Sequence, residues 1–170
     1  MNTKLIILDG ARGAGKSSVS ALLKEKMSNT VFVGLDLIRN LITKSKANDD
    51  FNDIAFDAIY SITDSFISNG VNVVIDSGLK EGRVQKLKEI ALKHKAFIFM
   101  YYLSAPKDVL WERIQKRGKE RNKMPSPERF DYTFKAQQSK DFSNFTEIDT
   151  TKHDPEKIAN KIYDEVYNLK

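Results

Sequence analysis

The residues best suited to chemistry lie near the start of the chain. Residues 10–17 read GARGAGKS and match the pattern G-x-x-x-x-G-K-[ST], which binds nucleotide phosphates when it lies between a strand and a helix. Its glycines let backbone N–H groups turn inward around an anion, and the following helix points its positive end at the phosphates. In this pattern Lys16 reaches the β- and γ-phosphates, and the hydroxyl of Ser17 binds magnesium. A chance match in a chain of this length has a probability of about one in a hundred at average residue usage.

The pattern therefore predicts a site for ATP and Mg²⁺. A glycine-rich turn with a surface lysine is the weaker interpretation. The residues expected to bind the nucleotide in this segment are Gly10, Arg12, Gly13, Ala14, Gly15, Lys16, Ser17 and Ser18.

Aspartates follow most of the apolar runs that read as buried strands. These runs are residues 4–8, 30–35, 71–75, 96–103 and, with a weaker pattern, 145–148. Four of them lead into an acid, namely Asp9, Asp36, Asp76 and Asp149. In open parallel sheets ligands bind at the carboxyl ends of the strands. We therefore expect these acids to lie along one edge of a sheet.

Amphipathic helices alternate with the strands. Residues 51–66 carry apolar side chains at a period of 3.6 and stop at Asn69-Gly70, a pair that ends helices. Residues 84–91 form a second helix, and residues 154–167 a third with Asp154 as its N-cap and Pro155 in its first turn. This alternation predicts an α/β fold, a parallel sheet with helices on both faces, in a single domain of residues 1–170.

Composition bounds the class of protein. The chain has 170 residues, 41% of them hydrophobic, and no cysteine, so disulfides, thiolate metal sites and cysteine nucleophiles are excluded. The longest apolar stretch, residues 96–103, is far too short to span a membrane, and we expect a cytoplasmic location. Residues 107–140 contain ten basic and five acidic residues, whereas residues 36–64 contain three basic and six acidic ones. The acidic segment argues against contact with a polyanion there.

Other classes of nucleotide-binding protein fit less well. A GTPase would carry D-x-x-G and N-K-x-D segments, but DSG at 76–78 does not match the first and TKHD at 151–154 matches the second only loosely. A mechanochemical ATPase needs more chain for its lid and partner-sensing parts. A small phosphotransferase remains.

Three further segments make the chain resemble the small P-loop kinases, a group that includes polynucleotide 5′-hydroxyl kinases, zeta-toxin kinases and metabolite kinases. They are DLIR at 36–39, similar to a D-x-x-R after the second strand, VVIDSGLKEGR at 73–83, and RIQKRGKER at 113–121, similar to an arginine-bearing lid. The likeness runs from Lys4 to about Gln138. It implies a five-stranded parallel sheet of order 2-3-1-4-5 with a mobile lid near residues 117–127.

The resemblance also implies roles around the second and third strands. Asp36 would accept the proton of the attacking hydroxyl, and Arg39, one helical turn on, would hold the acceptor. The plain alternative is that Asp36 caps its helix. Asp76 would organise magnesium through a water, and a solvated strand end is the alternative. Arg83 would contact the acceptor or be an ordinary surface charge.

The lid carries the remaining candidates. Arg113 and Arg117 are four residues apart on a predicted helix, and Gly118 is expected to release the chain from it. Arg117 would stabilise the charge that develops on the transferred phosphate, and Arg113 would brace the nucleotide. A solvated basic helix is the alternative. In related kinases the segment after the last strand, here Thr150 and Thr151, covers the base.

The predicted reaction is transfer of the γ-phosphate of Mg-ATP to a hydroxyl group. A small-molecule acceptor is slightly favoured over a nucleic-acid 5′-hydroxyl because of the acidic segment. A nucleotide-binding regulatory protein that transfers phosphate to no acceptor is the alternative from another class. The sequence does not predict an oligomeric state.

Overall fold

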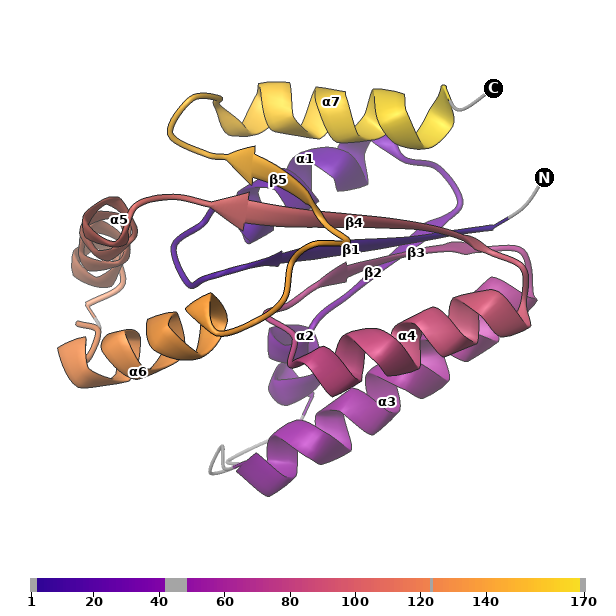
Figure 1. The fold of residues 1–170 in the computed structure, drawn as a ribbon, viewed down its shortest axis with the longest axis horizontal. Coiled ribbons are helices and arrows are strands. Elements are labelled where there is room, and N and C mark those ends of the chain that lie inside the picture. The colour runs from indigo at the N-terminus through magenta and orange to yellow at the C-terminus, as the bar shows by residue number, and fades with distance from the viewer. Residues whose placement is uncertain (1–2, 42–48, 123, 169–170) are drawn as a thin grey trace.

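The computed structural model describes residues 3–41, 49–122 and 124–168 (Figure 1). Five parallel strands form one sheet in the order β2-β3-β1-β4-β5, which confirms the predicted order. The strands are β1 (Lys4–Gly10), β2 (Thr30–Val33), β3 (Asn72–Asp76), β4 (Phe97–Ser104) and β5 (Thr146–Asp149). The helices are α1 (Lys16–Lys26), α2 (Leu35–Asn40), α3 (Asp49–Ser68), α4 (Glu81–Lys93), α5 (Lys107–Glu120), α6 (Pro127–Gln138) and α7 (Pro155–Tyr167).

The central strand β1 supplies side chains to both faces of the sheet. Ile6 and Leu8 are fully buried in the core formed with α1 and α7, whereas Leu5 and Ile7 are fully buried in the core formed with α3 and α4. Figure 1 shows these two helix layers on opposite sides of the strands. Because successive side chains of a strand point to opposite faces, a strand buried on both faces reads as the continuous apolar run seen in the sequence.

Two helix boundaries confirm the sequence signals. Helix α3 ends at Ser68, and Gly70 follows it with a φ of 80° and donates its N–H to the carbonyl oxygen of Ile67 at 3.1 Å. Asp154 caps α7, since its Oδ1 accepts the N–H of Lys157 at 2.8 Å.

The lid region differs from the prediction. Helix α5 continues through Gly118 to Glu120, because Leu110, Ile114 and Gly118 form one buried stripe along it. Helix α6 was not predicted at all. Its signals are present in the sequence, because Pro127 occupies the first turn and Ser126 caps the helix by accepting the N–H of Arg129 at 3.2 Å. Lys123, inside the expected lid, lies outside the described residues.

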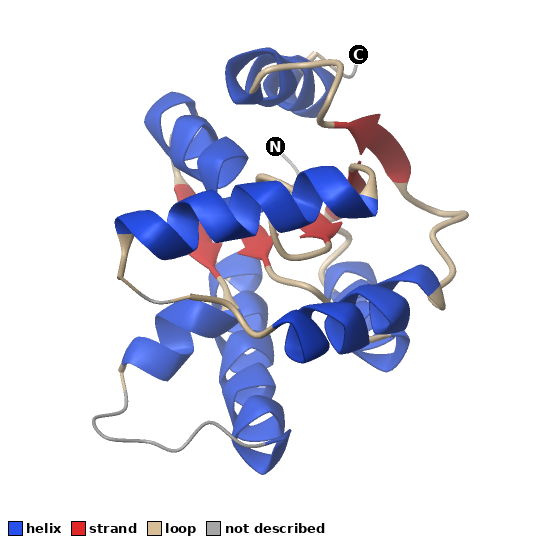
Figure 2. Cartoon of the chain, turned by 90° about the vertical axis from the view of Figure 1, so that its left-hand side faces the viewer, coloured by secondary structure: helices blue, strands red, loops and turns tan. Residues whose placement is uncertain are grey.

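Helices α5 and α6 lie at the carboxyl ends of the strands (Figures 1 and 2). The ring of Trp111 on α5 packs 5.1 Å from the ring of Phe130 on α6, and Phe130 is buried in the core shared with α1 and α7. Aromatic packing therefore joins the two helices to the body of the sheet. Across the described ranges, no helix is both long and apolar enough to cross a membrane.

Gly34 provides a test of the packing between β2 and β3. A Cβ atom at this position would lie 2.3 Å from the backbone oxygen of Asp76. We expect Gly34→Ala to lower the free energy of unfolding by about 2–3 kcal/mol, measured by urea denaturation, because the two backbones must move apart. Gly82→Ala is the control, since nothing lies within 4 Å of its Cβ, and it is expected to leave stability unchanged or raise it by up to about 1 kcal/mol. Equal midpoints for the two variants would contradict this close approach.

Candidate functional site

The glycine-rich loop connects β1 to α1, as the pattern requires. Its glycines adopt positive φ values, 149° at Gly10, 89° at Gly13 and 91° at Gly15, and Gly15 is the N-cap of α1. Gly13 is also needed for packing, because a Cβ there would lie 2.7 Å from the backbone oxygen of Leu110 on α5. The loop is therefore held against α5 by a contact that only glycine allows.

Lys16 lies at the centre of the acids at the strand ends. Its Nζ donates to the carbonyl oxygens of Gly10 at 2.7 Å and Ala11 at 3.1 Å. Burial lowers the pKa of Lys16, and the carboxylates of Asp76, Asp9 and Asp36 oppose that shift. Three of the four strand-end aspartates thus act on one ammonium group, as expected for acids gathered at one edge of the sheet. The fourth, Asp149, instead accepts from the backbone N–H and the hydroxyl of Thr151, in the turn after β5.

Asp76 and Ser17 form the part of the site that suits a magnesium ion. Burial raises the pKa of Asp76, and the charge of Lys16 and a hydrogen bond from the Ser17 hydroxyl oppose the rise. A carboxylate beside a hydroxyl is a pair of hard oxygen donors of the kind that Mg²⁺ prefers. Within the described ranges no group of three or more acidic, histidine or cysteine side chains could hold a metal. Two protein oxygens are sufficient for Mg²⁺ when phosphates and water complete its shell.

Asp36 lies in the first turn of α2, and the structure does not make it a cap. The N-cap of α2 is Gly34, and no side chain caps the helix, so the cap interpretation of Asp36 is wrong. The Asp36 side chain is 94% exposed and lies 3.6 Å from Arg39. Arg39 in turn donates to Asn52 on α3, while its Nε is buried without a hydrogen-bond partner. Asp36 is therefore accessible, and Arg39 is held beside it from two sides.

Arg117 of α5 and Arg129 of α6 are close enough to Arg12 of the loop for their charges to act on it. Burial lowers the pKa of Arg12, the charges of Arg117 and Arg129 lower it further, and Asp36 opposes the shift. Arg117 was predicted for this place, whereas Arg129 was missed because α6 was not recognised. Mutual repulsion of this kind is relieved when an anion binds between the cations.

Arg113 points to the turn after β5. Its guanidinium donates to the Thr150 hydroxyl at 2.8 Å and to the Thr150 carbonyl oxygen at 2.9 Å. The Thr150 hydroxyl donates onward to the carbonyl oxygen of Ser104 at 3.0 Å. Arg113 thus holds the segment that was expected to cover the base. Arg117, one turn further along α5, acts on Arg12 instead.

Arg83 is engaged in the packing of α4 on α3. Its guanidinium pairs with Asp53 at 2.7 Å and lies 3.9 Å from the centre of the Phe56 ring. Two more ion pairs join the same helices, and they are Asp57 with Lys86 and Asp64 with Lys93. The basic residues of α4 therefore offset the acids of α3, and the local excess of negative charge expected from residues 36–64 is smaller than the count implies. Residues 42–48 of that segment lie outside the described residues.

The fold and the loop together define a class. A parallel sheet of order 2-3-1-4-5, with this loop after its first strand and helices across the strand ends, is the fold of the P-loop kinases. Residues 6–138 match the family model described as an AAA domain, and the chain belongs to that family. None of the curated proteins matches the sequence.

Solved structures with this fold include kinases of several kinds. A chain of the Pnkp1/Rnl/Hen1 RNA repair complex is 22% identical with a TM-score of 0.68, and the match covers 80% of this chain and 44% of that one. A sugar kinase from Janibacter sp. HTCC2649 is 16% identical with a TM-score of 0.68, covering 94% and 92%. A gluconokinase from Sinorhizobium meliloti 1021 is 19% identical with a TM-score of 0.62, covering 98% and 99%. This chain thus spans less than half of the RNA repair protein that it matches.

Proposed function

We propose that residues 1–170 form one kinase domain that transfers the γ-phosphate of Mg-ATP to a hydroxyl group of a small molecule. The observation that carries the proposal is the convergence of Lys16, the Ser17–Asp76 pair and Asp36 at the carboxyl ends of β1, β3 and β2. Phosphoryl transfer needs little covalent help and depends on positioning and on neutralising charge. A cation, a pair of metal-binding oxygens and an exposed carboxylate are the groups that it requires.

Each group has a step in the proposed reaction. Lys16 holds the β- and γ-phosphates, and Arg12 and Arg117 stabilise the charge on the equatorial oxygens. Ser17 and Asp76 would hold Mg²⁺, which would supply charge neutralisation at the phosphates. The acceptor oxygen bonds to the γ-phosphorus as the bond to the β-phosphate oxygen breaks and ADP leaves. Asp36 accepts the hydroxyl proton, while Arg39 orients the acceptor.

The lengths of the matched kinases, rather than the surface charge of this chain, favour one kind of acceptor. The gluconokinase and the sugar kinase are matched over nearly their whole length, which supports a small-molecule acceptor. One observation keeps a polynucleotide 5′-hydroxyl as the second candidate, because the ion pairs between α3 and α4 remove much of the electrostatic objection to a polyanion. The expected cytoplasmic location stays a prediction.

Acceptor-dependent turnover tests the proposal. Purified protein is incubated with Mg²⁺, γ-labelled ATP and a panel of hydroxyl-bearing metabolites, nucleosides and 5′-hydroxyl oligonucleotides, and labelled products are separated from ATP. Label on a metabolite or nucleoside supports the first candidate, and label on oligonucleotides alone supports the second. Slow release of phosphate that no acceptor accelerates would favour the regulatory nucleotide-binding protein and contradict the kinase.

The bracing role of Arg113 predicts a selective loss of nucleotide affinity. We expect Arg113→Met to raise the Kd for ATP about tenfold, because two charge-assisted hydrogen bonds to Thr150 are lost and the turn after β5 is released. The control is Lys116→Met, which removes an exposed charge from the same helix. Titration with a fluorescent ATP analogue measures both. Equal affinity in the two variants would contradict a role for this turn in nucleotide binding.

A further inference from the structure

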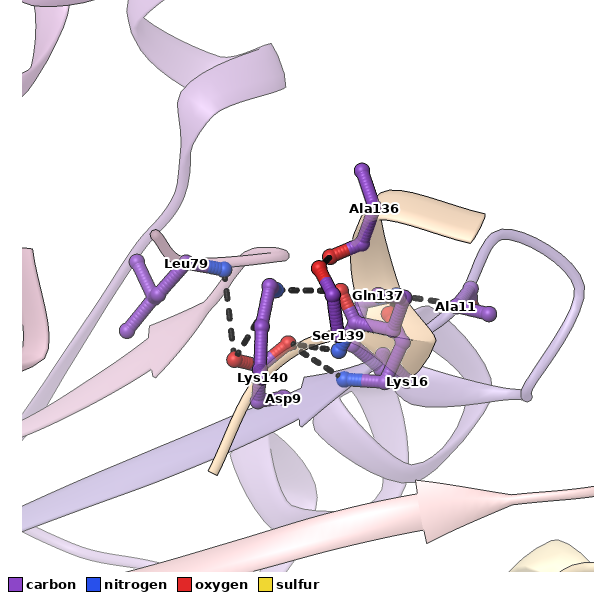
Figure 3. A network of polar contacts seen from close by, with 9 residues as sticks. Asp9, Ala11, Lys16, Leu79, Ala136, Gln137, Ser139 and Lys140 are labelled. Atoms are coloured by element: carbon purple, nitrogen blue, oxygen red, sulfur yellow. Dashed lines mark hydrogen bonds and ion pairs between the residues drawn. The ribbon is translucent and has the colours of Figure 1, made fainter. Parts of the chain in front are cut away.

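Asp9 is a buried carboxylate that the proposed reaction does not use. It is fully buried, and its oxygens accept three N–H groups from three segments (Figure 3). The donors are the Gly10 amide at 2.6 Å, the Leu79 amide at 3.3 Å and the Nε2 of Gln137 at 2.8 Å. One carboxylate therefore joins the start of the phosphate-binding loop, the turn after β3 and the last residues of α6.

Lys140 completes this group from just beyond the end of α6. Its Nζ lies 3.7 Å from Oδ2 of Asp9 and donates to Oε1 of Gln137. Burial lowers the pKa of Lys140, the charge of Asp9 opposes the shift, and the charge of Lys16 adds to it. The Lys140 side chain is only 15% exposed. The two lysines thus lie near the same carboxylate, one on the phosphate loop and one just after α6.

Loss of the polar contacts between Asp9 and the end of α6 is expected to be energetically unfavourable. A fully buried carboxylate that loses its partners is left with an uncompensated charge, which is far more unfavourable than an exposed broken pair. Gln137 is itself buried, at 5% exposure. The end of α6 is therefore held by polar contacts, whereas its beginning is held by the packing of Phe130 against Trp111.

Arg129 lies in the first turn of α6, directly before Phe130, and its charge acts on Arg12 of the phosphate loop. We propose that Asp9, Gln137 and Lys140 are positioning residues that hold α6 against the first residue of the phosphate-binding loop, so that Arg129 is kept beside the phosphates. The proposal rests on the proposed function, because it requires a phosphate in the loop. It assigns no contact with substrate to Asp9, Gln137 or Lys140.

The first test needs no nucleotide. Gln137→Met keeps the length of the side chain and removes both its hydrogen bonds, and amide hydrogen exchange of the free protein reports the hold on α6. We expect amides of the last turn of α6 to exchange about tenfold faster than in the wild type. Lys135→Met, which removes an exposed lysine of the same helix, is the control and should leave exchange unchanged. Unchanged exchange in Gln137→Met would overturn the proposal whether or not the protein is a kinase.

The second test separates positioning from general stability. We expect Gln137→Met to lower kcat about tenfold with a smaller change in the KM for ATP, because the loop and Lys16 remain. Lys140→Met should act in the same direction, and Lys140→Arg should restore most of the rate, since it keeps a cation near Asp9. The decisive comparison is Gln137→Met combined with Arg129→Met. The double variant should be no slower than Arg129→Met alone, because Gln137 is proposed to act through Arg129.

Each outcome has one meaning. Additive losses in kcat, or failure of Lys140→Arg to exceed Lys140→Met, would overturn the positioning role. A wild-type protein that phosphorylates no acceptor counts against the proposed function alone, and the exchange experiment then still decides whether Gln137 holds α6.

Discussion

Replacing Asp36 with asparagine is expected to slow phosphoryl transfer by about 10²- to 10⁴-fold, the usual contribution of a positioned proton acceptor. Asparagine has the same shape but cannot accept the hydroxyl proton. Its effect on folding is expected to be small, because the Asp36 side chain is 94% exposed and Gly34 rather than Asp36 is the N-cap of α2. Loss of a negative charge from the first turn should cost at most about 1 kcal/mol. The measurement is kcat with the best acceptor of the panel.

Two controls make the Asp36 result specific. Asp57→Asn removes another exposed aspartate, one that pairs with Lys86 of α4 at 3.6 Å, and it should leave kcat unchanged. Titration with a fluorescent ATP analogue should give the same Kd for Asp36→Asn and the wild type within a few-fold. If Asp36→Asn transfers phosphate at the wild-type rate while ATP still binds, Asp36 is not the proton acceptor.

Lys16→Met is expected to weaken ATP binding by roughly 10²- to 10³-fold, the range for truncating one partner of a buried, hydrogen-bonded charge pair. In the free protein the same change should not reduce the melting temperature. Burial lowers the pKa of Lys16, so the folded chain binds this proton less tightly than the unfolded chain, and at neutral pH the charge disfavours folding. Methionine fills similar space without that charge. The opposite directions of the two effects identify Lys16 as a binding residue.

The control for Lys16 comes from the same helix. Lys24 is exposed in the last turn of α1, and Lys24→Met should leave ATP affinity unchanged. Calorimetry for the melting temperature and equilibrium titration for the Kd are sufficient for both variants. Wild-type ATP affinity in Lys16→Met would remove the phosphate site on which the proposed function depends. A large fall in melting temperature would instead show that the hydrogen bonds to Gly10 and Ala11 hold the loop together.

Several features of the fold were predictable because they depend only on short contiguous segments of the sequence. The strands are continuous apolar runs, since both faces of the sheet are covered, and their limits differ from the predicted ones by one or two residues. Asp154 and Asn69-Gly70 act locally as a cap and a stop, and both are confirmed. The phosphate-binding loop needs only eight consecutive residues between a strand and a helix. Helix α6 was missed although its cap is equally local, because its buried stripe is short.

The charged residues show where local patterns stop being sufficient. Counting charges over residues 36–64 overestimated the acidity of that surface, because α4 packs beside α3 and supplies its partners. Arg113 and Arg117 share a helix, yet Arg113 donates to Thr150 while the charge of Arg117 acts on Arg12. Spacing on one helix cannot distinguish these roles, because each depends on which other element lies opposite.

The sequence by itself determined which chemistry is available: a loop for phosphates, oxygens for magnesium and an acid at the end of each of the first three strands. These follow from contiguous residues and from the rule that parallel strands end at one edge. Only the tertiary structure decided how α6 is attached, since Asp9 and Gln137 are 128 residues apart and neither shows a pattern that predicts the other. The hydrogen-bond donors of a buried carboxylate are those that packing places beside it in the folded chain.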